Sequence, residues 1–209
     1  MNESMNSSRR SFIYKGVYAG LAAFPLLNLD VLADCKLTTP SQEGPFYRAG
    51  APWLTRLCRP DEPGEPLVIV GRVTAADTCK PLSNAVVDVW HANHTGLYDN
   101  QMKEYENKFY LRGRMKTDAE GRYTFTTILP AAYSTGSSMR AKHIHYKISA
   151  PGYELLTTEL YFKGDKYNTT DSMVKPTLIT SLGDFKHPQE KRKFLKGTFD
   201  VVLAKAKTS

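Results

Sequence analysis

Short β-type segments separated by turn residues dominate the sequence from residue 34 to residue 209. The candidate strands are rich in β-branched and aromatic residues and cover residues 66–74, 85–92, 122–128, 143–150, 155–162 and 198–204. Gly, Pro, Asn and Asp stand between them, and no long helical periodicity is present. The pattern predicts an all-β fold, a sandwich or a barrel, and we expect a single β-sandwich. Its long loops at 93–115 and 163–190 should carry the functional residues.

Composition agrees with one self-sufficient domain. The chain has 209 residues, of which 41% are hydrophobic and 23% are charged, which excludes a disordered polymer. Its three cysteines are too few for a disulfide framework that replaces a core.

The first 33 residues predict an export signal. Arg9-Arg10 is followed by Lys15 and by an apolar run at 16–29, which resembles a twin-arginine signal with cleavage after Ala33. The alternatives are a buried helix that starts with two arginines, and lipid attachment at Cys35, for which Asp34 is the wrong neighbour. We therefore expect a signal peptide at 1–33 and an exported, periplasmic or extracellular domain at 34–209, with no membrane association once processed.

Two histidines in one candidate strand suggest a metal site. Side chains at i and i+2 of a strand share a face, so His143 and His145 should project together while Ile144 enters the sandwich. Export of an already folded protein also fits a metal that is inserted before export.

Two tyrosines in loop contexts could complete such a site. Tyr98 follows Gly96-Leu97, and Tyr133 closes the segment that begins at Pro130. Because a tyrosine has a pKa of about 10, its phenolate is a poor ligand for divalent ions at neutral pH. A hard trivalent ion such as Fe(III) can hold it.

Together these motifs resemble the intradiol ring-cleavage dioxygenases, the family of protocatechuate and catechol dioxygenases. The resemblance runs from about residue 35 to residue 165. It rests on TPSQEGPFY at 39–47, GRV at 71–73, CKPL at 79–82, AVVDVWHAN at 85–93, GLY at 96–98, RAKHIH at 140–145 and LYFKGD at 160–165.

The resemblance implies a non-haem Fe(III) cofactor and a role for each site residue. The metal ligands would be Tyr98, Tyr133, His143 and His145. A catechol-type substrate would displace Tyr133, which takes up a substrate proton, and O2 would open the ring to a muconate-type diacid. Arg140 would face the substrate and stabilise negative charge on the ring, and Pro45 would line the substrate mouth.

The sequence also departs from the family. Glu159 stands where many members have glutamine, and its carboxylate could repel anionic substrates or turn outward. The helical region through which catechol-type members dimerise has no counterpart, so a monomer and a homo-oligomer both stay open.

Several other residues have a structural interpretation. We expect His91 to be structural, His94 and His187 to be solvated, and Trp90 to lie in the core. At most one disulfide can form, with Cys58–Cys79 the first expectation and Cys35–Cys79 the second.

The net charge of +7 says little about function. Seven basic residues lie at 186–207 without a nucleic-acid motif, which predicts a solvated surface and no nucleic-acid partner. The alternatives to an enzyme are a transthyretin-like or carbohydrate-binding sandwich module, which needs no Tyr/Tyr/His/His set, and a degenerate family member that binds phenolic ligands without turnover.

Overall fold

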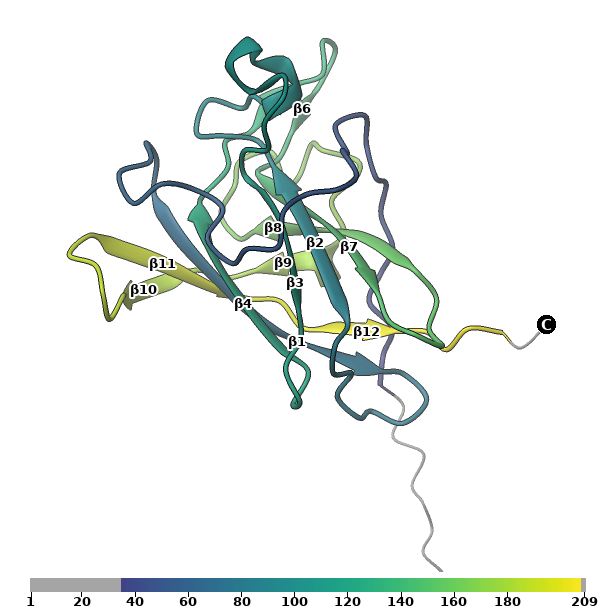
Figure 1. Cartoon of the computed structure of the whole chain (residues 1–209). Helices are drawn as coiled ribbons and strands as arrows, with labels where there is room; N and C mark the ends of the chain where they lie inside the picture. Colours follow the sequence, from purple (N-terminus) through teal and green to yellow (C-terminus); the bar gives the residue numbers. More distant parts are fainter. Residues whose placement is uncertain (1–34, 208–209) are drawn as a thin grey trace, which may run out of the picture. The chain divides into compact units, whose positions relative to one another are not determined.

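The computed structural model describes residues 35–207, which form two β-sheets packed face to face (Figure 1). One sheet, here called the β7 sheet, has the order β3-β2-β7-β8-β9, with antiparallel neighbours except for the parallel pair β8 and β9. Its strands are β3 (Arg112–Lys116), β2 (Val86–His91), β7 (His143–Ser149), β8 (Leu156–Phe162) and β9 (Ile179–Thr180). The predicted histidine strand, β7, is therefore at the centre of its sheet.

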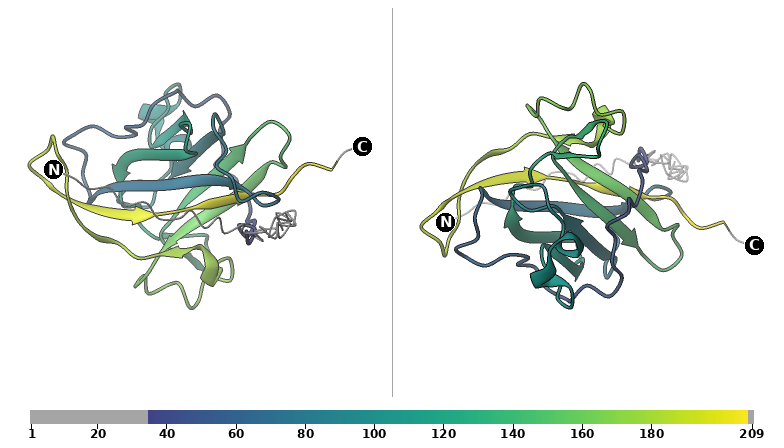
Figure 2. Two further views of the ribbon diagram at one scale, coloured as in Figure 1. Left: turned by 90° about the horizontal axis from the view of Figure 1, so that it is seen from below. Right: turned by 90° about the horizontal axis from the view of Figure 1, so that it is seen from above.

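The second sheet, the β1 sheet, is built around β1 (Pro66–Ala75). β4 (Arg122–Ile128) pairs with β1 in antiparallel fashion, while β11 (Lys193–Thr198) and β12 (Val201–Leu203) pair in parallel with successive parts of it. β10 (Gly183–Lys186) pairs with β11 at the edge, and Figure 2 shows β1 in blue beside β11 and β12 in yellow. Between β11 and β12 the Phe199 carbonyl approaches Gly71 so closely that a Cβ there would lie 1.9 Å from its oxygen, so this position requires glycine.

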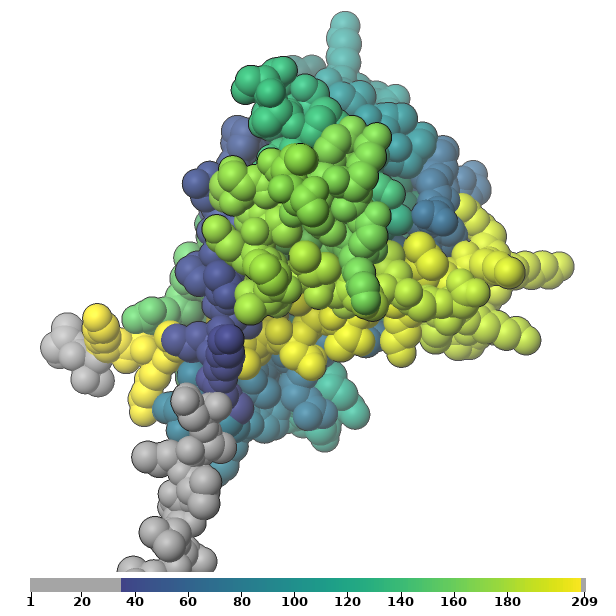
Figure 3. Space-filling model, turned by 180° about the vertical axis from the view of Figure 1, so that it is seen from behind, coloured from purple at the N-terminus to yellow at the C-terminus, as the bar shows by residue number. Residues whose placement is uncertain are grey.

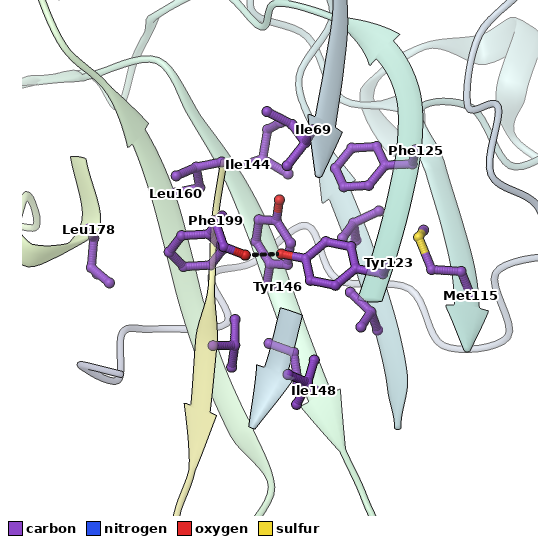
Figure 4. Close-up of a cluster of buried hydrophobic side chains, with 14 of the residues drawn as sticks. Ile69, Met115, Tyr123, Phe125, Ile144, Tyr146, Ile148, Leu160, Leu178 and Phe199 are labelled. Carbon is purple, nitrogen blue, oxygen red and sulfur yellow. Dashed lines mark hydrogen bonds between the residues drawn. The ribbon is translucent and has the colours of Figure 1, made fainter. Parts of the chain in front are cut away.

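The core lies between the two sheets and follows the two-residue alternation of each strand. In β7 the inward side chains are Ile144, Tyr146 and Ile148, all of them fully buried (Figure 4). The Tyr123 hydroxyl crosses this layer and donates a 2.6 Å hydrogen bond to the carbonyl of Phe199. Because Ile144 points into the core, its neighbours His143 and His145 face the outer side of the β7 sheet.

Loops and an N-terminal arm cover this outer side. The loops include the short helices η1 (Asp99–Gln101) and η2 (Lys103–Tyr105) and the hairpin of β5 (Tyr133–Ser134) and β6 (Met139–Arg140), at the upper end of the sandwich in Figure 1. The arm, residues 35–47, is bound to β12 through Thr38 N and Val202 O (3.2 Å). In Figure 3 it is the purple segment beside the yellow-green loop that contains η3 (Pro176–Leu178).

Five of the predicted strands coincide with β1, β2, β4, β7 and β8 to within one residue at each end. The sixth, 198–204, is shorter and appears as β12. The predicted loops at 93–115 and 163–190 were too long, because β3 begins in the first and β9 and β10 lie in the second. The seven basic side chains of 186–207 are exposed, as predicted.

The predicted signal peptide, residues 1–33, lies outside the described residues. Within residues 35–207, none of the helices has the length and apolar character needed to cross a membrane.

The disulfide joins Cys35 to Cys79, with the two Cα atoms 5.5 Å apart. Our first expectation, Cys58–Cys79, was wrong, and Cys58 is a half-buried free thiol. The reason is the path of the arm, which runs beside β12 and so reaches the turn after β1 that carries Cys79. Cys58 instead follows Leu57, whose amide bonds to Thr126 of β4. The bridge also occupies the sulfur that lipid attachment at Cys35 would need.

Candidate metal centre

The two histidines of β7 converge on the outer face of the sheet. His143 and His145 are 2% and 1% exposed, and their Nε2 atoms lie 3.2 Å apart. The Nδ1 atom of His143 donates to the Ala141 carbonyl at 2.6 Å, which leaves its Nε2 lone pair available to a metal. The Nδ1 atom of His145 lies beside the backbone of Gln42 and 3.5 Å from Glu159 Oε1. The predicted histidine pair therefore has the arrangement of two ligands of one ion.

Tyr98 supplies a third donor from the loop after β2. Its hydroxyl lies 3.1 Å from His145 Nε2 and 3.4 Å from His143 Nε2, and the residue is 1% exposed. The three donor atoms form a nearly equilateral triangle. A triangle of this size lets all three reach a single ion through bonds of about 2 Å.

Tyr133 lies next to this triangle, on β5. Its ring centroid is 5.6 Å from that of Tyr98 and 5.6 Å from that of His143, and its ring is nearly perpendicular to that of Tyr98. Unlike Tyr98, Tyr133 is only partly buried. The structure thus brings all four predicted ligands together, with Tyr133 on the open side.

Burial controls the protonation of these four groups. It lowers the pKa of His143 to about 4, and burial together with the nearby His143 lowers the pKa of His145 well below its usual value, so both rings are neutral at pH 7. Burial also raises the pKa of Tyr98 well above 10 and raises the pKa of Tyr133. The phenols therefore keep their protons unless a strong cation binds, and two phenols with two neutral imidazoles fit a hard, highly charged ion.

Aromatic rings hold two of the donors in place. Trp90 stacks on His145 with ring centroids 4.8 Å apart, and Phe46 of the arm stacks on Tyr98 at 4.3 Å. Gly44 passes over His145 with φ +71°, and a Cβ there would lie 3.4 Å from the imidazole. Trp90 is buried, as predicted, but it packs against the site and not in the core between the sheets.

Arg140 and Glu159 form a buried ion pair beside the histidines. Arg140 Nη2 donates to Glu159 Oε1 at 2.7 Å, and Arg140 Nε donates to Asp171 Oδ2 at 3.0 Å. Glu159 also accepts hydrogen bonds from Tyr161 Oη at 2.7 Å and from Ser41 Oγ. Of the two orientations left open for Glu159, the structure shows the inward one.

Glu159 could also take part in metal binding. Its Oε1 lies 3.6 Å from His143 Nε2, and the two histidines and Glu159 offer donor atoms within 4.8 Å of one another. Both of its oxygens are already hydrogen-bonded, whereas the Nε2 atoms point toward Tyr98. The arrangement therefore favours the tyrosines as ligands, with Glu159 as a charged neighbour.

Sequence reasoning missed the residues that position Tyr98. Its neighbour Asp99 is 1% exposed and accepts from Arg112 Nε at 2.8 Å and from Arg48 Nη1 at 3.0 Å. The contact between Asp99 and Arg112 therefore anchors the loop directly beside Tyr98. The acidic residue directly after Tyr98 was a usable signal, but Arg112 lay in a segment predicted to be a loop.

A cavity of about 530 Å³ opens beside the donors. Its walls include Tyr133 and Arg140, which face each other across the β5–β6 ladder, and Pro45 of the arm. The remaining lining is mostly uncharged and includes Phe46, Leu97 and Met139. All three residues predicted to meet the substrate thus line one cavity.

The other histidines lie apart from this cluster. His91 is buried and bonds to Thr127 Oγ1 at 2.7 Å and the Ala92 carbonyl at 2.8 Å, in keeping with a structural role. His94 is exposed, as predicted. His187 lies in the loop after β10, where it is partly exposed, with its ring centroid 4.8 Å from that of Phe194.

Comparison with known proteins agrees with this geometry. Residues 42–205 match the family model described as Dioxygenase. The chain is 42% identical over 142 residues to catechol 1,2-dioxygenase 2 of Acinetobacter lwoffii, a match that covers 60% of this chain and 51% of that protein. The chain therefore spans about half the length of this relative.

Two solved structures have the same fold. The dioxygenase domain of a dioxygenase carbohydrate-binding protein fusion from Streptomyces sp. SirexAA-E is 37% identical, with a TM-score of 0.70 over 82% of this chain and 100% of that one. Catechol 1,2 dioxygenase of Acinetobacter radioresistens is 30% identical, with a TM-score of 0.76 over 83% of this chain and 64% of that one. On the family match and these likenesses together, the chain belongs to the intradiol dioxygenase family.

Proposed function

We propose that the chain is a non-haem Fe(III)-dependent dioxygenase that opens a catechol-type ring with O2 between its two hydroxyl-bearing carbons, giving a muconate-type diacid. The observation that carries the proposal is the convergence of Tyr98, His143 and His145 on one point, with donor atoms 3.1–3.4 Å apart and Tyr133 beside them. The relatives named catechol 1,2-dioxygenase support the same reaction class.

Tyr98, Tyr133, His143 and His145 would hold the iron. Bound Fe(III) would supply the Lewis acidity that lowers the pKa of the catechol hydroxyls and the charge transfer that makes the ring reactive toward O2. The neutral imidazoles contribute lone pairs without needing to lose a proton, because burial has already lowered their pKa.

Tyr133 is the ligand best placed to exchange with substrate. It lines the cavity, whereas Tyr98 is enclosed behind Phe46. Once released, its phenolate oxygen would accept a proton from an incoming catechol, since burial gives the free phenol a raised pKa.

Arg140 and Pro45 would position the ring. The Arg140 guanidinium stays charged and lies across the hairpin from Tyr133, so it can stabilise negative charge that develops on the substrate. Pro45 forms part of the apolar wall that limits where the ring can lie.

Colour provides the first test. Iron-loaded protein should be red from tyrosinate-to-Fe(III) charge transfer, and with catechol it should consume O2 and release the diacid in equal amounts. Tyr98→Phe and His145→Ala should lose iron, colour and turnover together. Tyr153→Phe, on the turn between β7 and β8, is the matched control and should keep all three.

The outcomes separate the alternatives. Iron-loaded protein that stays colourless would overturn the metal assignment. A red protein that binds catechol without consuming O2 would be a binding-only family member. A sandwich module of the transthyretin-like or carbohydrate-binding kind would show neither colour nor turnover.

We also propose that the protein acts outside the cytoplasm. The Arg9-Arg10 pair supports export, and so does the Cys35–Cys79 disulfide, since such bonds persist in oxidising compartments. Replacing both arginines with lysine should retain the protein in the cytoplasmic fraction. Unchanged export would remove the twin-arginine route from the proposal.

A further inference from the structure

We infer that Glu159 determines which catechols the cavity accepts, by admitting rings with uncharged substituents and rejecting rings that carry a carboxylate. The inference rests on the proposed function and assigns a specificity role to a residue that is not a predicted metal ligand. It follows from the burial of Glu159, from its partners and from the balance of charge around the cavity.

The Glu159 carboxylate is held inside the site. It is 0% exposed, and its partners are Arg140 Nη2 (2.7 Å), Tyr161 Oη (2.7 Å) and Ser41 Oγ. Tyr161 is on the same strand, β8, whereas Arg140 on β6 and Ser41 on the arm belong to two other segments, so contacts from three segments hold the carboxylate inside the site.

This carboxylate changes the net charge that a substrate encounters near Arg140. Among the described residues that line the cavity, Arg140 alone carries a charged side chain. The guanidinium is bound by two carboxylates, Glu159 at 2.7 Å and Asp171 at 3.0 Å, whose side chains are 0% and 2% exposed. The local cluster therefore has one more negative charge than positive.

A carboxylate on the substrate ring would add a second excess negative charge. With glutamine at position 159, the positive charge of Arg140 and the negative charge of Asp171 would cancel, and the anionic substrate would encounter a cluster with no net charge. At an effective dielectric constant of about 20, two like charges separated by the width of a substrate ring repel enough to change an affinity by about tenfold or more. The iron and its ligands are the same in wild type and in Glu159→Gln, so their effect on a charged ring cancels when the acid-to-ester preferences of the two proteins are compared.

The rest of the cavity wall fits uncharged substituents. Pro45, Phe46, Leu97 and Met139 present apolar surface, and the Leu97 side chain is 43% exposed and so available to contact a ligand. A hydrogen, halogen or alkyl group on the ring would pack there without losing hydrogen bonds to water.

The negative charge of Glu159 should also affect the absorption spectrum of bound Fe(III). Glu159 Oε1 lies 3.6 Å from His143 Nε2 and 3.5 Å from His145 Nδ1. A negative charge this close makes Fe(III) a weaker electron acceptor. Removing it should move the tyrosinate-to-Fe(III) absorption band to longer wavelength.

The experiment compares two probes of the same shape that differ in charge. Iron-loaded wild-type protein, Glu159→Gln and the control Glu154→Gln are titrated without O2 with 3,4-dihydroxybenzoate and with its neutral methyl ester. The change of the visible band gives each Kd. Glu154 is exposed, so its substitution makes the same change in net charge away from the site.

We expect wild type and Glu154→Gln to bind the ester at least about tenfold more tightly than the acid. Glu159→Gln should reduce this preference about tenfold and shift the band to longer wavelength. Equal affinities in wild type would overturn the inference, and this measurement needs no variant to fold. So would an iron-loaded Glu159→Gln protein with an unchanged ratio.

Failure of the proposed function gives a different result. It would appear as wild-type protein without the visible band or without O2 uptake on catechol. A red, active protein that does not distinguish the two probes would refute only the role of Glu159.

Discussion

The imidazole of His145 lies flat against the indole of Trp90, with centroids 4.8 Å apart and ring planes 3° apart. The two residues are register partners on β7 and β2, so the sheet itself sets this contact. Trp90 is 1% exposed. The stacking fixes the plane of the His145 ring. The backbone position of His145 alone would leave that ring free to rotate.

Trp90→Ala should therefore affect both stability and metal retention. Loss of this buried ring should lower the free energy of unfolding by about 3–5 kcal/mol, and the freed His145 should release iron to a chelator faster than in wild type. Urea unfolding followed by circular dichroism and a chelator-release assay measure the two effects. Trp53→Ala is the control, because Trp53 is 54% exposed and stacks only on cations at the surface; equal losses in both variants would contradict the assignment.

Arg140→Gln should weaken the fold and slow turnover while iron and colour remain. The substitution leaves Glu159 and Asp171 without their cation, and breaking such a buried pair lowers the free energy of unfolding by about 3 kcal/mol. Adding Glu159→Gln should recover part of that loss, since one of the two unpaired charges is gone. A double-mutant cycle measures the coupling, with the exposed Arg122→Gln as a control expected to change the free energy of unfolding little.

The apoprotein should lose stability as the pH falls below about 6.5. Burial lowers the pKa of His91 to about 4, so between pH 6.5 and 4 the unfolded chain carries a proton there that the folded chain does not. The contribution of His91 is complete above this window and decreases through it, by about 3 kcal/mol in total. His143 and His145 act in the same direction.

Substitution of His91 isolates its share of that slope. His91→Gln should reduce the slope of unfolding free energy against pH by about 1 kcal/mol per pH unit near pH 5. His94→Gln changes an exposed ring and should leave the slope as it is. Urea unfolding at half-unit steps measures both, and identical slopes for His91→Gln and wild type would contradict the prediction.

Removing the disulfide should destabilise the chain more than removing the free thiol. Cys35 and Cys79 close a loop with a sequence separation of 44 residues, which corresponds to about 2–4 kcal/mol of constraint on the unfolded chain. Cys35→Ser with Cys79→Ser should lower the free energy of unfolding by that amount, whereas Cys58→Ser should have a small effect. Similar midpoints for the double and single variants would argue against the bridge.

The strands that the sequence predicted well are those whose own pattern determines them. Residues 122–128 follow a turn at 117–121 and alternate between polar and aromatic side chains as far as Thr126, and they form β4 with the predicted bounds. By contrast β3 reads Arg-Gly-Arg-Met-Lys, which has no apolar alternation. It becomes a strand because β2 pairs with it and because Asp99 neutralises the buried Arg112.

The four proposed metal ligands could be predicted because each lies in a recognisable local motif, whereas the contacts of the residues around them could not. His143 and His145 identify themselves by spacing, and the family resemblance added Tyr98 and Tyr133. The contact of Glu159 with Arg140 and the pairing of Cys35 with Cys79 depend on the register of β8 and on the path of the arm. Both are set by long-range packing, which a local pattern does not encode.

Arg112, Trp90, His145 and Glu159 stand opposite one another in a single row across β3, β2, β7 and β8. The ladder that aligns them is made by the backbone, so a change of the side chain at position 159 leaves the register of β7 and β8 in place. Under the proposed function, a substitution that changes the charge at position 159 should therefore alter substrate preference while β7 keeps His143 and His145 in place. Because β8 carries position 159 and β7 carries the two histidines, evolution could change the substrate preference of such a site without moving the proposed ligands.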